Sequence, residues 1–299
     1  MTGSRVLAVA SGKGGVGKTT TAVALGACAA AAGRSAVVVD ADLGMGNLGT
    51  MVGLTDATPT VHDVLAGSAD VDDAIHEAPG DFDVVPGSAN LEQYAEADPA
   101  GLRDVVEDLR ARYDLVVLDS GAGLSHDTVL PLGLADEVVL VTTAADIAVA
   151  NTATTREVAN RLGADVRGVL VTSATGDVDT VRERIDAPIL GTVPRDEAIE
   201  SAADAGVPVT VHAPESPAAR AYAEFVASVL EVPVTSMDLP DATTAETTGE
   251  TPAETPAPDI PDAEGATLTD EDEAESEPEQ SRSLINRLSG GLIGGNDNN

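Results

Sequence analysis

The sequence predicts an α/β fold in which a mainly parallel sheet is flanked by helices on both faces. Two observations support this fold class. Short apolar runs of the kind found in strands buried on both faces recur along residues 1–230, and helical patterns separate them. With 299 residues, of which 43% are hydrophobic, the chain is also long enough to bury a large core.

The expected elements follow one another as β-α units, without an internal repeat. Strands are expected at residues 5–10, 36–40, 83–86, 114–119, 137–143, 166–172 and 188–193. Helices are expected at residues 17–32, 99–112, 147–162, 178–185, 197–205 and 217–230, several of which begin with Asp, Ser or Thr near the cap position.

The chain is strongly acidic. It has 51 Asp and Glu against 16 Lys and Arg, a net charge of −35, and this sign argues against nonspecific binding to DNA phosphates or to anionic lipid. A single cysteine, Cys28, excludes an intramolecular disulfide and a multi-cysteine metal site, and its apolar helix predicts a core position. No apolar run reaches the length of a membrane span and no signal peptide is evident, so a cytoplasmic protein is expected.

The basic residues are unevenly chosen. Fourteen are arginine, and the two lysines, Lys13 and Lys18, fall in one motif. The excess of carboxylates and the scarcity of lysine indicate a halophilic protein, because a dense carboxylate surface stays hydrated at molar salt, where the Debye length is about 3 Å. Against this bias, the two retained lysines predict a role that a compact ammonium group fills better than a guanidinium group, such as binding phosphate.

A glycine-rich phosphate loop joins the first expected strand to the first expected helix. Its sequence is Ser11-Gly12-Lys13-Gly14-Gly15-Val16-Gly17-Lys18-Thr19-Thr20. In such a P-loop, backbone N–H groups of residues 12–20 bind phosphate oxygens and the helix N-terminus adds partial positive charge. Lys18 is expected to reach the β- and γ-phosphates of ATP, and the Thr19 hydroxyl to bind Mg²⁺.

The additional lysine makes this motif more specific. Residues 12–20 resemble the deviant Walker A motif of the MinD/ParA family of ATPases. The resemblance, which covers residues 4 to about 230, implies a homodimer that sandwiches ATP. In that dimer Lys13 would cross to the phosphates bound by the other subunit, in the manner of an arginine finger.

Two further motifs follow in the order that this resemblance implies. Residues 37–48 look like switch I, in which Asp42 would position the attacking water and Asp40 would support the Mg²⁺ shell. Residues 115–119 form a Walker B pattern that ends in Asp119, whose carboxylate would hold a magnesium-bound water.

The match to the family weakens at three places. Residues 119–123, Asp-Ser-Gly-Ala-Gly, resemble switch II, and Gly121 stands where the family more often has proline, which predicts a looser switch. Residues 143–146 read Thr-Ala-Ala-Asp where MinD proteins usually have Thr-Asn-Pro-Glu, so partner contacts on the following helix are not carried over. Pro194 and Arg195 resemble the family's loop near the adenine only in part.

The residues present also separate the branches of the family. Branches that bind an iron–sulfur cluster between subunits need cysteine ligands, which Cys28 cannot supply from the P-loop helix. Bacterial tyrosine kinases need a C-terminal tyrosine cluster, whereas all 3 tyrosines here precede the tail. DNA-segregating ParA proteins need a basic surface, whereas this chain is poor in cations. The MinD branch, which binds membrane through a C-terminal amphipathic helix, fits this chain better.

The C-terminal part has a different composition. Residues 231–280 contain sixteen Asp and Glu, seven Pro and no Lys or Arg, which predicts a disordered acidic linker. Residues 281–299 are expected to form a short amphipathic docking segment, with Leu284, Ile285 and Leu288 on one side and Arg287 near the headgroups. This segment would bind a membrane surface reversibly, with avidity from two copies on a dimer. A helix that docks on a protein partner and a terminus without a role are the alternatives.

These observations predict an ATPase domain at residues 1–230, followed by the linker and the docking segment. The predicted function is an ATP-dependent, dimerising switch of the MinD type, which hydrolyses ATP to ADP and phosphate. It would position division, surface-filament or chemosensory machinery with the help of an unidentified partner or cargo. The alternatives are a ParA-like partitioning ATPase and a scaffold that uses ATP only to dimerise.

Overall fold

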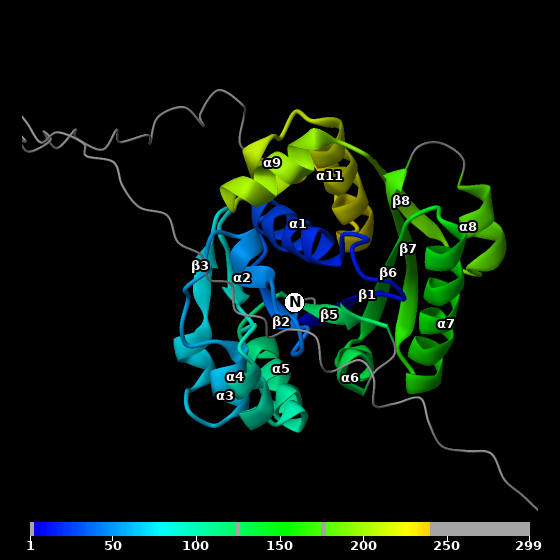
Figure 1. The fold of residues 1–299 in the computed structure, drawn as a ribbon. Helices are drawn as coiled ribbons and strands as arrows, with labels where there is room; N and C mark the ends of the chain where they lie inside the picture. Colours follow the sequence, from blue (N-terminus) through cyan, green and yellow to red (C-terminus); the bar gives the residue numbers. More distant parts are fainter. Residues whose placement is uncertain (1–2, 124–125, 175–177, 240–299) are drawn as a thin grey trace, which may run out of the picture. The chain divides into compact units, whose positions relative to one another are not determined.

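The computed structural model describes residues 3–123, 126–174 and 178–239. Within these ranges the chain forms an eight-stranded sheet in the order β3-β4-β2-β5-β1-β6-β7-β8, with helices on both faces (Figure 1). The strands are β1 (Arg5–Ser11), β2 (Ala36–Ala41), β3 (His76–Ala78), β4 (Phe82–Val85), β5 (Leu115–Ala122), β6 (Glu137–Thr142), β7 (Asp165–Ala174) and β8 (Ile189–Pro194). Among these described strands, β3 runs antiparallel to β4 and all other neighbours are parallel. The predicted fold class is confirmed.

Two layers of helices cover the sheet, and Figure 1 shows α1 and α11 on one face and α5 and α6 on the other. The first face carries α1 (Lys18–Ala31), α2 (Leu48–Met51), α9 (Glu197–Ala205), α10 (Val209–His212) and α11 (Pro217–Leu230). The second carries α3 (Val61–Leu65), α5 (Leu102–Arg110), α6 (His126–Leu134), α7 (Asp146–Leu162) and α8 (Asp179–Arg184). A short α4 (Leu91–Glu96) follows β4. In the described part of the chain, no helix has both the length and the hydropathy needed to cross a membrane.

Alternate strand residues face two separate cores. Val9 of β1 packs in the core under α1, whereas its neighbour Ala8 packs in the core on the opposite face. Helix α1 lies very close to the sheet, because a Cβ atom at Gly26 would lie only 2.4 Å from Cδ2 of Phe82. Cys28 is buried in the same helix, and burial raises the pKa of its thiol to about 12. The predicted core position of Cys28 is confirmed. Because α1 packs closely on the sheet, it holds the P-loop close to the sheet.

Most predicted elements lie close to their expected ends, and α9 and α11 have the predicted bounds. The helix predicted at residues 99–112 is instead a 3₁₀ turn at Pro99–Gly101 followed by α5. Strand β5 runs past Asp119 to Ala122, because the Ser120 hydroxyl donates to the Val9 carbonyl at 2.8 Å and Ala122 pairs with Ser11. Six further elements have no counterpart among the elements expected from the sequence: β3, α2, α3, α4, α6 and α10. Most of these are short, and α6 contains Pro131, a residue that disfavours a helix interior.

The described chain continues in packed form beyond α11. The N–H group of Asp238 donates to the Ala31 carbonyl at 2.8 Å, and Met237 is buried. Residues 231–239, which composition assigns to the linker, therefore pack on the domain, because Val232, Met237 and Leu239 supply apolar contacts. The remainder of the predicted linker and the predicted docking segment, residues 240–299, lie outside the described residues.

Candidate nucleotide-binding site

The P-loop lies between β1 and α1, at the carboxyl edge of the parallel strands. Gly15 and Gly17 have φ angles of 72° and 90°, in the left-handed region that residues with a Cβ rarely adopt. Gly17 is the N-cap residue of α1, and no side chain caps this helix end. The first N–H groups of α1 are therefore available to an anion, as the motif predicts.

Neighbouring elements hold the P-loop from behind. The Thr172 hydroxyl, on β7, donates to the Val16 carbonyl at 2.6 Å, and the Thr21 hydroxyl donates to the Gly17 carbonyl at 2.7 Å. At the start of the loop, a Cβ atom at Gly12 would lie 2.2 Å from the carbonyl carbon of Asn151 on α7. Only glycine fits there, and the fold fixes the shape of the loop without help from a ligand.

The two lysines have different surroundings. Lys18 is the first residue of α1 and only 9% exposed, and its ammonium group lies near enough to Asp119 to lower the pKa of that carboxyl. Lys13 is exposed and makes no ion pair with any described residue. The Lys18 ammonium is thus part of the site within this chain, whereas the Lys13 ammonium is accessible to groups outside the chain.

Two acids meet beside the P-loop. Asp40 and Asp119 are paired across β2 and β5, and they are 0% and 1% exposed. The Asp40 carboxylate accepts hydrogen bonds from the N–H groups of Leu48 at 3.0 Å and Asp42 at 3.2 Å. Asp119 Oδ1, in contrast, has no hydrogen-bond partner among the described residues. Because a buried acceptor without a partner is costly, this oxygen marks a place for a cation.

Burial, and then the charge of a neighbouring carboxylate, raises the pKa of both acids. Burial, and then the charge of Asp40, raise the pKa of Asp119 to about 7, and the Thr19 hydroxyl and Lys18 oppose this only in part. Burial raises the pKa of Asp40 to about 6 against the opposing hydrogen bonds from the backbone of Leu48 and Asp42. Two carboxylates that resist simultaneous ionisation are a suitable environment for a divalent cation.

The donor set fits Mg²⁺ bound together with a nucleotide. No cluster of three acidic, histidine or cysteine side chains that could hold a metal occurs in the described part of the chain. Mg²⁺ does not require one, because it usually takes one or two carboxylates together with phosphate oxygens and water. Thr19 and Asp119 would hold it, while both Asp40 oxygens are already engaged by the backbone of switch I.

Asp42 lies half-buried in the loop after β2, on the part of switch I that is next to switch II. Its Oδ1 accepts from the N–H group of Met45 at 3.2 Å. A Cβ atom at Gly121 would lie 3.1 Å from this oxygen and 2.6 Å from Cγ2 of Thr128. The structure therefore shows a close approach of switch II at Gly121, where the sequence predicts a looser switch, because the missing side chain lets the backbone move in.

The other predicted site residues lie apart from this centre. Pro194 ends β8 and Arg195 is exposed directly after it, and β6 and β7 separate β8 from β1 in the sheet. The next residue, Asp196, accepts from the N–H groups of Ala198 and Ala218, each at 3.0 Å. Contact of Pro194 and Arg195 with adenine stays a prediction. Leu284, Ile285, Arg287 and Leu288 lie outside the described residues.

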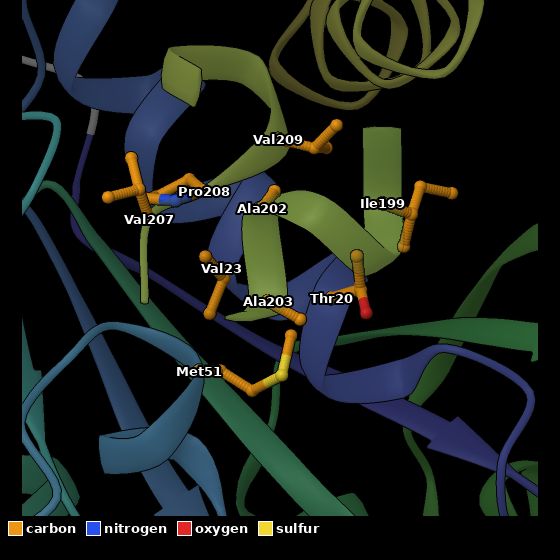
Figure 2. Close-up of a pocket in the computed structure, with 9 residues that line it drawn as sticks. All are labelled: Thr20, Val23, Met51, Ile199, Ala202, Ala203, Val207, Pro208 and Val209. Atoms are coloured by element: carbon orange, nitrogen blue, oxygen red, sulfur yellow. The ribbon is translucent and has the colours of Figure 1, made fainter. Parts of the chain in front are cut away.

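Two hollows adjoin the P-loop and α1. The larger, about 210 Å³, lies between the P-loop, switch II and α7 and is lined by Gly12, Gly123, Asn151 and Thr154. The smaller lies between α1, α2 and the α9–α10 region, and Figure 2 shows Met51 reaching toward Ala203 across it. At about 10 Å³ it is about the size of one water molecule, so it is a packing gap and not a ligand site.

Three residues of the site are not predicted from the sequence. Asn47 Oδ1 accepts from the Thr19 hydroxyl at 3.0 Å, and Thr172 supports the P-loop. Gly87, after β4, lies so close to Asp40 that a Cβ atom there would be 2.8 Å from Cγ of Asp40. Asn47 lies within the switch I motif and could have been found there, but Thr172 and Gly87 carry no local signal.

The uncapped α1 with its glycine loop, the buried lysine and the paired acids define a P-loop nucleotide-binding protein. Comparisons with known proteins agree. A family model described as an AAA domain matches residues 4–166. An uncharacterized ATP-binding protein of Methanocaldococcus jannaschii is 33% identical over 229 residues, which cover 75% of this chain and 87% of the relative.

Two further relatives have names that state a function. The solved structure of the septum site-determining protein MinD of Pyrococcus horikoshii OT3, complexed with Mg-ADP, matches with a TM-score of 0.73 and 30% identity, over 76% of this chain and 96% of that chain. The chromosome partitioning protein ParA of Caulobacter vibrioides is 42% identical over 146 residues, 45% of this chain and 54% of ParA. The chain belongs to the MinD/ParA family of P-loop ATPases.

Proposed function

We propose that this protein is a switch of the MinD type, which dimerises on ATP and is reset by hydrolysis of ATP to ADP and phosphate. The observation that carries the proposal is the contrast between buried Lys18 and exposed Lys13. An exposed ammonium beside the phosphate loop, without an ion-pair partner among the described residues, is suited to phosphates bound by a second subunit. Lys18 would then act within the chain and Lys13 across the dimer.

The residues of the chain divide the remaining work. N–H groups of the P-loop bind phosphate oxygens, and Thr19 and Asp119 hold Mg²⁺, which supplies charge neutralisation at the phosphates when bound. Asp42 orients the attacking water. Asp40 keeps Asp42 in place, because its carboxylate accepts from the N–H group of Asp42. The Mg-ADP bound to the MinD of Pyrococcus horikoshii supports this choice of cofactor.

The test compares the wild type with Lys13→Ala and Asp42→Asn in ATP and in ADP, with light scattering for mass and phosphate release for turnover. The buffer contains molar KCl, since a halophilic origin is part of the proposal. We expect the wild type to dimerise in ATP only, Lys13→Ala to bind ATP as a monomer, and Asp42→Asn to remain a dimer with slow hydrolysis. Wild-type mass and turnover in Lys13→Ala would contradict the role across the dimer.

We further propose that residues 281–299 bring the ATP-bound dimer to a membrane surface, where it positions other machinery. Each copy contributes Leu284, Ile285 and Leu288, which alone bind weakly, whereas two copies bind by avidity. Co-sedimentation with archaeal-type lipid vesicles tests this, with a truncation after residue 280 as control. The full chain should pellet in ATP only. If neither protein pellets, membrane binding is excluded, and residues 281–299 are either a helix that docks on a protein partner or a segment without a role.

A ParA-like partitioning ATPase is the second candidate, and the similarity to ParA of Caulobacter vibrioides favours it. The net charge of −35 opposes it, because nonspecific DNA binding needs basic surface and weakens steeply with salt. Retention of the ATP-bound dimer on duplex DNA at molar KCl would support it. If the wild type dimerises but releases no phosphate, the protein is a scaffold that uses ATP without turnover.

A further inference from the structure

His62 is a fully buried histidine for which the proposed function has no role. It lies on α3 and is 0% exposed. Its Nε2 is 2.8 Å from the Leu43 carbonyl oxygen, and its Nδ1 is 3.0 Å from the backbone nitrogen of Ser88. A carbonyl can only accept and a backbone N–H can only donate, so these partners require the neutral ring with its proton on Nε2.

The two partners belong to the two loops that surround the acids of the site. Leu43 directly follows Asp42, the residue proposed to orient water. Ser88 directly follows Gly87, whose backbone lies against the carboxylate of Asp40. One imidazole ring therefore connects the loop that carries Asp42 with the loop that covers Asp40.

Helix α3, which carries the ring, is held by contacts that do not involve His62. Helix α3 begins with a capping box, in which Asp63 Oδ2 accepts from the backbone N–H and the hydroxyl of Thr60 at 2.7 and 2.9 Å. The N–H group of Val61 donates to the Pro86 carbonyl at 2.8 Å, and Gln93 Nε2 donates to Asp63 Oδ1 at 2.9 Å. Helix α3 is thus a fixed support, and the loops are positioned relative to it.

We propose that His62 is a positioning residue for ATP hydrolysis, in which Nε2–H holds the Leu43 carbonyl and thereby fixes the backbone that carries Asp42. The proposal rests on the proposed role of Asp42. A displacement of a water-orienting group by about 1 Å can cost up to about a hundredfold in rate. Loss of the bond to Leu43 should therefore lower kcat, while the affinity for Mg-ATP, which the P-loop sets, should remain.

Two amide variants separate the two hydrogen bonds of the ring. In His62→Gln the side-chain amide nitrogen is as many bonds from Cα as Nε2, so it can still donate to Leu43. In His62→Asn the amide oxygen is as many bonds from Cα as Nδ1, so it can still accept from Ser88. Each variant keeps one bond and loses the other, which makes them matched controls for burial and polarity.

The experiment measures steady-state hydrolysis, Mg-ATP affinity and the thermal unfolding midpoint of both full-length variants at molar KCl. We expect kcat of His62→Gln to be within about threefold of the wild type and kcat of His62→Asn to be about tenfold lower, with unchanged Mg-ATP affinity. Equal values of kcat in the two variants would overturn the proposal, because a merely structural histidine would be affected alike by both changes.

Two further measurements keep the outcome unambiguous. If Asp42→Asn hydrolyses ATP like the wild type, the proposed role of Asp42 fails, whatever the His62 variants do. If Asp42→Asn is inactive and the two His62 variants are equal, only the role of His62 fails. Should neither His62 variant fold, NMR of the full-length wild type with isotope-labelled histidine decides the matter. A His62 ring without a proton on Nε2 at neutral pH would overturn the proposal, since such a ring cannot donate to the Leu43 carbonyl.

Discussion

The two sides of the nucleotide site are built on opposite principles. On the phosphate side, the P-loop is supported by satisfied hydrogen bonds from Thr172 and Thr21 and by the close packing of Gly12 on α7. On the metal side, two buried carboxylates face each other across β2 and β5, and Asp119 Oδ1 has no partner among the described residues. One side is relaxed before a ligand binds, and the other is under electrostatic repulsion.

This difference assigns separate tasks to the two sides. A preorganised loop binds phosphate without reorganisation, so it supplies affinity. A pair of acids that repel each other is stabilised only when a cation is present, so it makes the folded state sensitive to Mg²⁺. Substitutions on each side should therefore have separable effects, on nucleotide affinity for the phosphate side and on the stability of the ligand-free protein for the metal side.

Replacement of Lys18 should break the phosphate side most severely. Lys18→Ala removes a buried ammonium at the phosphate position, and a charged hydrogen bond of this kind corresponds to a loss of about a hundredfold in ATP affinity. Lys13→Ala is the matched control, because it removes an exposed lysine from the same loop, and its affinity should remain within about threefold. Titration with ATP and Mg²⁺ measures both. Equal affinity of the two variants would mean that the loop alone binds the phosphates.

Neutralisation of Asp119 should make the ligand-free protein more stable. Asp119→Asn removes the repulsion between two buried carboxylates, which we expect to raise the free energy of unfolding by about 2 kcal/mol and the unfolding midpoint by about 5 °C. The measurement is thermal unfolding at pH 8 without nucleotide. Mg-ATP should raise the midpoint of the wild type more than that of the variant, which keeps the P-loop and Lys18 but lacks the carboxylate for Mg²⁺. A lower midpoint in ligand-free Asp119→Asn would show that the pair is not repulsive.

The burial of these acids, together with the repulsion, predicts a pH dependence with a definite sign. The pKa values of Asp40 and Asp119 rise from 3.8 to about 6 and about 7 on folding, so between about pH 4 and 7 the folded state binds more protons than the unfolded state. The free energy of unfolding from these groups therefore falls as the pH rises, by about 1.4 kcal/mol per pH unit for each group and by up to about 2.5 kcal/mol per pH unit for both. The surface carboxylates contribute in both proteins, so the readout is the stability gap between Asp119→Asn and the wild type. This gap should be large at pH 8 and small at pH 5, and a gap independent of pH would contradict the assignment.

The phosphate side could be predicted from the sequence because its determinants are local. A strand, a glycine loop and a helix follow one another directly, and the φ angles of Gly15 and Gly17 are those that the motif requires. The carboxyl on β5 could be predicted for the same reason, since Asp119 directly follows an apolar run of four residues. These local motifs predict the family, which the comparisons confirm, and the structure confirms the fold class.

The metal side and its supports depend on contacts between distant segments. The pairing of Asp40 with Asp119 requires the register of β2 on β5, which no local pattern specifies. His62 lies on a helix of 5 residues, too short for a hydrophobic period, and Thr172 is one of several threonines at strand ends. The close approach of Gly121 to Asp42 also depends on distant segments and carries no local signal, and a looser switch II stays a prediction.

The smallest expected effect lies on the phosphate side, where Thr172 supports the loop through one hydroxyl. Thr172→Val keeps the shape of the side chain but removes the donor to the Val16 carbonyl, a hydrogen bond worth about 1 kcal/mol. We expect ATP affinity to fall by about fivefold, because the free loop no longer holds its binding conformation. Thr172→Ser keeps the hydroxyl and should bind like the wild type. Wild-type affinity in Thr172→Val would mean that the glycines and the packing on α7 fix the loop alone. An equal loss in Thr172→Ser, which keeps the hydroxyl and removes the methyl group next to Gly17, would contradict the assignment of the effect to the hydroxyl alone.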